Sequence, residues 1–307
     1  MSKSTISTFE LFALIPDQET ARAYLETRLW PNGPHCPCCG LSDRLTPRKK
    51  GFFRCNQCKE DFTVRTGTVF ERSHIPLHKL IYAMYLLVTA RKGISSLQLA
   101  KEIGITQKSA WFVLHRLREA CGGELSKLQG IIEIDETYVG GKEANKHESK
   151  KLNAGRGAVG KTAVLAMRER GKGGRTVGMT VNNTDMATIH TAIYDNIEIG
   201  SRIHTDEHLA YSGLDGLLFD HETVNHSDGE YVRDDVTTNS IESVFAVLKR
   251  GLIGVYHHAS KKHLDRYVDE FAFRLNEGNV ARHTLDRLDS FIAGVAGKRL
   301  TYANLIA

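Results

Sequence analysis

The chain has 307 residues, of which 41% are hydrophobic, and it carries 41 Lys and Arg against 36 Asp and Glu. This length and composition can fill the cores of two or three domains, and the mild positive balance fits a nucleic-acid partner without requiring one. We find no run of 18 apolar residues and no basic-then-apolar signal pattern at the N-terminus, so we expect a cytoplasmic protein with no membrane partner and with reduced cysteines.

The first element expected from the N-terminus is helical. Residues 9–29 place apolar side chains at helical spacing, and Pro16 followed by Asp17 predicts a break and a new helix start. The turn-forming run at 30–34 (WPNGP) then ends the helix and leads into a cysteine-rich segment.

Five of the six cysteines lie between positions 36 and 58, which indicates a local metal site rather than disulfides spread over the chain. Two C-x2-C pairs are present, Cys36 with Cys39 and Cys55 with Cys58. Tetrahedral zinc needs two converging pairs of thiolates, so this spacing predicts a zinc ribbon with one structural zinc ion. The alternative, reduced cysteines without a metal, would leave paired thiols open to oxidation. Cys38 could replace Cys39 without closing a two-residue knuckle, and whether Cys38 or His35 joins the site stays open.

Three helical segments follow between residues 76 and 120. Ser95 or Ser96 is a candidate cap for the second, Gly104 turns the chain, and Thr106 caps the third. This layout is typical of a helix-turn-helix, in which the last helix lies in the DNA major groove. The side chains it would offer to bases and phosphates are Gln107, Lys108, Ser109, His115 and Arg116. A helical bundle without DNA contact would show the same spacing, and the neighbouring ribbon shifts the balance towards nucleic acid.

An acidic residue inside an expected strand organises the rest of the chain. In residues 131–142 (IIEIDETYVGGK), Ile132 and Ile134 alternate with Glu133 and Asp135 at the two-residue period of a strand. One face of this strand is therefore apolar and the other acidic. A carboxylate on a sheet is costly to desolvate unless a cation meets it, so Asp135 predicts a metal site.

Two further carboxylates are candidates for the same site. Asp206 ends the strand-like run 201–208 (SRIHTDEH), and Glu242 lies in the helix-like run 237–252 (TTNSIESVFAVLKRGL). Between them and the first strand, residues 162–183 predict a hairpin and residues 185–197 a helix, which makes a mixed α/β layer. On the Glu242 helix, Asn239 and Lys249 fall on the same face as the carboxylate.

One motif in this region is interpreted as misleading. Residues 155–162 (GRGAVGKT) match the phosphate-loop pattern of nucleotide-binding proteins. A phosphate loop follows a buried strand and opens a helix, whereas here a polar, basic loop precedes the motif and a strand-like run follows it. We therefore expect no nucleotide partner and interpret the segment as a basic entry to a hairpin, which could touch a DNA backbone.

Two strand aspartates and a helix glutamate meet at one sheet edge in ribonuclease-H-like folds, where they hold two divalent cations for phosphodiester chemistry. Mg²⁺, or Mn²⁺ in its place, prefers such oxygen ligands. Other acidic side chains nearby are interpreted as solvated charges: Glu133, Glu136, Glu207, Asp234 and Asp235. The irregularly spaced histidines are interpreted as surface or core residues rather than a second zinc site: His204, His208, His221 and His226.

The order of several motifs resembles the ISXO2-like insertion-sequence transposases of the IS1595 family over nearly the whole chain. These motifs include CPCCG, RCNQCKEDFTVRTGTVFE, IEIDETYVGGK, VNHSDGEYV and NSIESVFAVLKRGLIGVYH. The resemblance implies a zinc ribbon, a DNA-binding helical region and an Asp-Asp-Glu catalytic domain in which Asp135, Asp206 and Glu242 bind the metal. It also implies DNA contacts from Lys249 and its neighbour Arg250, with Asn239 in support. Phe245 departs from the pattern, where a Trp is expected.

We therefore expect a multidomain α/β protein, divided into an N-terminal helix and zinc ribbon (1–72), helix-turn-helix-like DNA-binding helices (73–125), a ribonuclease-H-like catalytic domain (126–280) and a C-terminal tail (281–307). The expected function is that of a bacterial DNA transposase that binds terminal repeats, cuts at their 3′ ends and joins them to target DNA, as a homo-oligomer assembled on double-stranded DNA. A DNA-binding regulator with a decayed catalytic fold is the first rival, and the three intact acids count against decay. A nuclease of the same fold without strand transfer is the second, which joining assays would separate.

Overall fold

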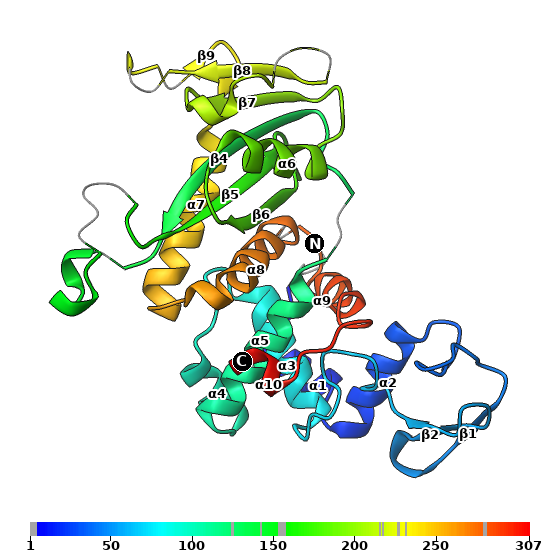
Figure 1. Ribbon diagram of the computed structural model, residues 1–307. Helices are drawn as coiled ribbons and strands as arrows, with labels where there is room; N and C mark the ends of the chain where they lie inside the picture. The colour runs from blue at the N-terminus through cyan, green and yellow to red at the C-terminus, as the bar shows by residue number, and fades with distance from the viewer. Residues whose placement is uncertain are drawn as a thin grey trace. The chain divides into compact units, whose positions relative to one another are not determined.

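The computed structural model describes residues 5–123, 126–141, 143–152, 158–214, 216, 218–225, 228–230, 232–278 and 281–307. The chain divides into two compact units, one formed by Met1–Gly123 with Glu277–Ala307 and the other by Glu124–Asn276 (Figure 1). Within the described ranges, no helix combines the length and the apolar character needed to cross a bilayer.

The first unit begins with two helices and a small sheet. Helix α1 spans Thr8–Leu14 and α2 spans Gln18–Leu29. The carboxylate of Asp17 accepts from the Thr20 N–H at 2.8 Å, so the predicted helix start after Pro16 is confirmed. Strands β1 (Leu45–Pro47), β2 (Phe53–Cys55) and β3 (Asp61–Phe62) then form an antiparallel sheet in that order.

The three predicted helices of the first unit are present as α3 (Leu77–Thr89), α4 (Ser96–Ile103) and α5 (Gln107–Cys121). Ser95 accepts from the Gln98 N–H at 3.1 Å, and Thr106 accepts from the Ser109 N–H at 3.2 Å. Gly104 ends α4 with a φ of 64°, a left-handed conformation that favours glycine. The predicted caps and the predicted turn are therefore confirmed.

The prediction of a C-terminal tail at 281–307 is wrong. This segment contains α9 (Thr284–Ala293) and α10 (Tyr302–Ile306), and it belongs to the first unit. Helix α9 contacts α2 and α3, and its apolar side chains Leu288, Phe291 and Ile292 are buried. Asp289 accepts from Tyr24 at 2.9 Å and from Arg28 at 2.6 Å. The second unit therefore ends at Asn276 rather than at the predicted residue 280, because burial of this apolar face ties the last 31 residues, 277–307, to α2 and α3.

The second unit is built on a mixed five-stranded sheet in the order β6-β5-β4-β7-β8. The strands are β4 (Ile131–Val139), β5 (Thr162–Glu169), β6 (Thr176–Val181), β7 (Arg202–Asp206) and β8 (Asp220–Val224). β4, β5 and β6 form an antiparallel meander, whereas β7 and β8 run parallel to β4. The central strand β4 thus has an antiparallel neighbour on one side and a parallel neighbour on the other.

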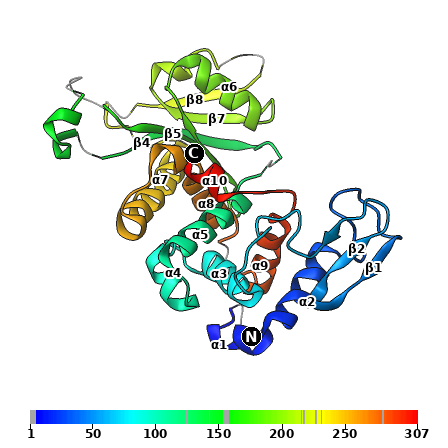
Figure 2. The ribbon, with the colours of Figure 1, turned by 60° about the horizontal axis from the view of Figure 1, so that its bottom comes forward.

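Helices cover both faces of this sheet (Figure 2). Helix α6 (Met186–Asn196) packs on the face that carries Ile132 and Ile134. Helices α7 (Asn239–Gly251) and α8 (Leu264–Asn276) pack on the opposite face. Side chains alternate along a strand, so Glu133 and Asp135 leave β4 on the face that α7 covers.

Shorter elements complete the described chain. A hairpin of β9 (Val232–Arg233) and β10 (Val236–Thr237) leads into α7. A π-helix at Leu252–Tyr256 directly follows α7. Short 3-10 turns lie at Lys49–Gly51, Glu143–Asn145, Glu148–Lys150, Leu209–Tyr211 and Lys261–His263.

Candidate metal sites

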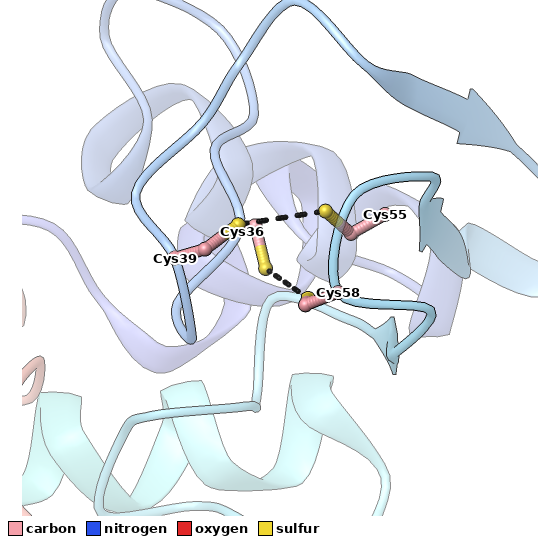
Figure 3. Close-up of side chains that lie close together, drawn as sticks. All are labelled: Cys36, Cys39, Cys55 and Cys58. Atoms are coloured by element: carbon pink, nitrogen blue, oxygen red, sulfur yellow. Dashed lines mark hydrogen bonds between the residues drawn. The ribbon is translucent and has the colours of Figure 1, made fainter.

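The four cysteines of the two C-x2-C pairs converge at one point of the ribbon (Figure 3). Their Sγ atoms all lie within 4.8 Å of one another, with 3.5 Å between Cys36 and Cys58 and 3.6 Å between Cys39 and Cys55. A tetrahedral zinc ion with Zn–S bonds of about 2.3 Å places its sulfurs about 3.8 Å apart. The thiol cluster therefore fits a structural zinc ion, and neither Cys38 nor His35 is among the four clustered residues.

Local structure favours the thiolate form of one of these four cysteines, Cys55. Backbone N–H groups, that of Cys58 first and that of Gln57 in support, lower the pKa of Cys55 to about 6 despite its burial. A thiolate is the form that binds zinc, so the turn after β2 favours the required protonation state. Around the sulfurs, Trp30 packs edge-on against Phe53 and Phe62, which gives the ribbon a small aromatic core.

The three predicted carboxylates come from three separate elements of the second unit. Asp135 lies in the middle of β4, Asp206 is the last residue of β7, and Glu242 lies in the first turn of α7. Asp135 and Asp206 are half-buried, whereas Glu242 is exposed. Asp135 Oδ1 accepts from the N–H of Glu136 at 2.7 Å, and Asp206 Oδ1 accepts from the N–H of His208 at 3.0 Å.

Electrostatic coupling links these three carboxylates. Burial raises the pKa of Asp135 to about 7, and the negative charges of Glu136, Asp206 and Glu242 add to the rise, while the Glu136 N–H opposes it. The negative charges of Asp206 and Glu242 therefore disfavour ionisation of Asp135. A divalent cation would favour the charged form of all three, and an all-oxygen donor set suits Mg²⁺ or Mn²⁺. In the described ranges, however, only the thiol cluster brings three or more ligand atoms together tightly enough to hold an ion.

The interpretation of Glu133 and Glu136 as solvated charges is wrong. Glu133 is 1% exposed and binds Arg170 and the start of α7. Glu136 has 8% of its side chain exposed and accepts from the Tyr211 hydroxyl at 2.6 Å. Strand position explains both, because each face of β4 is covered by other elements and an acidic residue there must find a donor. An alternating run is typical of a strand with one solvated face, so the pattern of β4 by itself does not reveal that both of its faces are covered.

The other three acidic residues interpreted as solvated charges are exposed: Glu207, Asp234 and Asp235. Asp235 forms an ion pair with Arg202 at 2.6 Å. His204 is fully buried, as expected of a core histidine, and His208 is exposed. His226 lies outside the described residues, as do residues 155–157 of the phosphate-loop lookalike. The strand predicted to follow that motif is present, because Thr162 opens β5.

The predicted DNA-contacting residues fall into two groups. Exposed side chains are found at Gln107, Lys108, Lys249 and Arg250, and at the supporting residue Asn239. Ser109 is half-buried, and its hydroxyl lies 2.9 Å from that of Thr106 within the cap of α5.

Arg116, by contrast, is 8% exposed and donates to the carbonyl oxygens of Glu71 at 2.9 Å and Leu300 at 3.4 Å. This placement overturns the expectation that Arg116 reaches DNA, because its guanidinium binds backbone inside the unit. His115, which was expected beside it, is fully buried.

Comparison with known proteins agrees with this arrangement. A family model described as the ISXO2-like transposase domain matches residues 127–276, and one described as a transposase zinc-ribbon domain matches residues 16–61. An uncharacterized protein in the transposable element ISH50 of Halobacterium salinarum is 33% identical over 257 residues, which is 80% of this chain and 86% of the relative. The chain belongs to the ISXO2-like transposase family.

The two matched regions of this transposase follow the architecture of the chain. The transposase-domain match lies within the second unit, and the zinc-ribbon match runs from the residue before Asp17 to the first residue of β3. Among solved structures, a chain of the simian T-cell lymphotropic virus intasome in complex with PP2A regulatory subunit B56 gamma shows 12% identity and a TM-score of 0.30. That likeness covers 62% of this chain and 65% of the intasome chain, so this chain spans just under two thirds of its length.

Proposed function

We propose that this transposase binds the terminal repeats of its insertion sequence, cleaves the DNA at their 3′ ends and joins those ends to target DNA. The observation that supports the proposal is that Asp135, Asp206 and Glu242 come from elements on the α7 side of one sheet, and that the charges of Asp206 and Glu242 add to the rise in the pKa of Asp135 that burial causes. Family membership supports the same conclusion for the chain as a whole.

The strand order of the second unit supports a ribonuclease-H-like catalytic domain. An antiparallel meander of three strands is extended by two strands parallel to the first, and helices cover both faces. In this arrangement Asp135 and Asp206 come from strands paired in parallel, and Glu242 comes from a helix packed on the same face. The three acids would hold divalent cations, which when bound activate a water or 3′-hydroxyl nucleophile and stabilise the leaving oxygen.

The remaining residues bind and orient DNA in this proposal. Lys249 and Arg250 are exposed near the end of α7, the helix that also carries Glu242. From there they can contact phosphates of the DNA backbone. In the first unit, Gln107 and Lys108 are exposed at the start of α5, the position from which a recognition helix reads the major groove. The ribbon and helices α3 to α5 would recognise the terminal repeats, and pairing of two ends would require at least two protomers.

The experiment uses duplexes that carry the element's inverted repeats, a supercoiled target plasmid and Mg²⁺. Wild type should cleave the repeat ends and join them to the plasmid. Glu242→Gln keeps the size of the side chain but removes a ligand charge, so cleavage and joining should both fall on the order of a thousandfold while repeat binding stays near wild type.

Glu207→Gln is the matched control, because Glu207 follows Asp206 directly and is exposed. It should retain substantial activity. Full activity in Glu242→Gln together with loss in Glu207→Gln would show that the third ligand has been assigned wrongly. Cleavage without joining in wild type would favour the nuclease alternative.

A further inference from the structure

Glu133 is a buried carboxylate on β4 for which the proposed chemistry has no role. It is 1% exposed, and burying an ionised carboxylate is strongly unfavourable unless donors surround it. One of its oxygens accepts from Arg170 Nε at 3.1 Å. The other accepts from the backbone N–H groups of Ser240 at 2.8 Å and Ile241 at 3.1 Å. Glu133 therefore joins the central strand of the sheet to the start of α7.

The two amides bound by Glu133 belong to the first turn of α7 and immediately precede Glu242. The first N–H groups of a helix have no partner within the helix, and the side chain of the N-cap residue Thr238 makes no capping hydrogen bond. Glu133 supplies the cap from another element. Its negative charge also suits the positive end of the helix dipole, which strengthens the attachment.

Two arginines hold the segment that leads into α7. Arg170 donates to the carbonyl oxygens of Asp235 and Thr237, and Arg202 on β7 donates to both carboxylate oxygens of Asp235 at 2.6 and 3.1 Å. Because Arg170 also binds Glu133, one network of charges ties the approach to the helix and its first turn to strands β4 and β7. Those are the strands that carry Asp135 and Asp206.

We propose that Glu133, held by Arg170, is a positioning residue that sets where Glu242 lies relative to Asp135. Glu133 and Asp135 are two residues apart on β4 and leave the same face of the sheet, and the amides that Glu133 caps adjoin Glu242. The inference rests on the proposed function, because it treats Asp135 and Glu242 as metal ligands. Glu133 itself lies in contact with helix backbone and is assigned no metal-binding role.

Glu133→Gln tests this role with little change in size. A glutamine presents one oxygen and one NH₂ group, so in either orientation the NH₂ group faces a donor, Arg170 or the α7 amides. We expect Mn²⁺ affinity of the zinc-loaded protein, measured by calorimetry without DNA, to fall about 10-fold to 100-fold, the usual effect of removing a group that orients a metal ligand. Amide hydrogen exchange at residues 240–242 should accelerate, and cleavage should need more Mg²⁺, with repeat binding unchanged.

Glu169→Gln is the matched control. Glu169 is also a largely buried carboxylate, with 14% of its side chain exposed. It accepts from the guanidinium of Arg175 and from two backbone N–H groups, those of Gln129 and Arg175, each at 3.0 Å. It holds the hairpin of β5 and β6 and makes no hydrogen bond to α7 among the described contacts. Its variant should lose similar global stability and keep wild-type Mn²⁺ affinity.

Equal Mn²⁺ affinity and equal Mg²⁺ requirement in Glu133→Gln and Glu169→Gln would overturn the positioning role. If Glu133→Gln does not fold, Arg170→Lys is the deciding variant. A single lysine nitrogen would replace the three guanidinium nitrogens that separately bind Glu133 and the carbonyl oxygens of Asp235 and Thr237. A wild-type metal response in that variant would overturn the inference. A loss of Mn²⁺ affinity in Glu242→Gln but not in Glu133→Gln refutes this inference alone. A wild type that neither binds Mn²⁺ at this site nor cleaves DNA refutes the proposed function as well.

Discussion

The thiol cluster of the ribbon and the proposed carboxylate site of Asp135, Asp206 and Glu242 are assembled in opposite ways. The four cysteines lie within 23 residues of sequence, positions 36–58, and their sulfurs are already at zinc-binding distances. The three carboxylates come from β4, β7 and α7; burial raises the pKa of Asp135, and the negative charges of Asp206 and Glu242 add to that rise. Neighbouring thiols can be brought together by two tight turns, whereas like charges on separate elements need a scaffold to hold them near one another.

Because of this difference, a substitution in the thiol cluster should affect folding, and one in the proposed carboxylate site should affect activity. The ribbon surrounds its sulfurs with few apolar side chains, so its fold depends on the metal. The carboxylate site stands on a sheet with cores on both faces, which remain when a ligand is changed. Loss of a thiol should therefore unfold a segment, and loss of a carboxylate should leave the fold intact.

The largest expected effect is that of Cys55→Ser. The free energy of binding of structural zinc is on the order of 10 kcal/mol, more than a segment of this size supplies by packing. Zinc content measured by elemental analysis should fall from about one ion per chain to near zero, and residues 30–62 should become sensitive to limited proteolysis. Cys38→Ser, which changes an exposed thiol outside the cluster, should keep both properties of wild type. Retention of zinc and protection in Cys55→Ser would contradict the assigned ligands.

A smaller effect of opposite sign is expected for Asp135→Asn. The pKa of Asp135 is about 7 in the folded chain and about 3.9 in an unfolded one, so the wild type loses stability as pH rises between these values and no further above them. In zinc-loaded protein without added Mg²⁺, the variant should be more stable than wild type by on the order of 4 kcal/mol at pH 8, and the gain should shrink towards pH 4. Thermal unfolding measured across this range checks the sign.

The control for that series is Glu207→Gln, which removes a charge from an exposed side chain next to Asp206 and should not reproduce the gain at pH 8. Added Mg²⁺ should reduce the difference between Asp135→Asn and wild type, because a ligand that binds only the folded wild type stabilises it. A gain that is constant from pH 4 to pH 8 would show that burial of charge at Asp135 has been overestimated.

The same contrast explains what could be predicted from the sequence. The ribbon ligands, the caps at Asp17, Ser95 and Thr106, and the alternation along β4 are local patterns, each set by residues close in sequence. These predictions are confirmed as structure. The ligand roles of Asp135, Asp206 and Glu242 stay predictions, although two strands and the helix that packs on them carry the three acids on one side of the sheet.

What could not be predicted depends on contacts between distant segments. Glu133 resembles a strand-edge charge until α7, more than 100 residues later, places its amides on the carboxylate. Arg116 falls on a helix expected to meet DNA, and its burial depends on carbonyl oxygens of Glu71 and Leu300. Helix α9 was not predicted to be part of the first unit, also because this depends on a distant contact. The apolar face of the helix shows that it packs on something but not on which segment.

The smallest expected effect concerns the exposed charge at Lys249, seven residues after Glu242 on α7. Lys249→Ala removes one cation that the proposal places on a phosphate, so repeat affinity should fall a few-fold and the slope of log affinity against log salt should drop by about one. Lys172→Ala is the matched control, because Lys172 is also exposed and lies in the turn between β5 and β6. Binding titrations over a range of salt concentrations compare the two.

Since a phosphate contact carries no sequence information, the loss at Lys249 should be the same on repeat and non-repeat DNA. A loss confined to the repeats, or one matched by Lys172→Ala, would remove α7 from the proposed DNA surface and leave the carboxylate site without the cation assigned to guide the substrate to it.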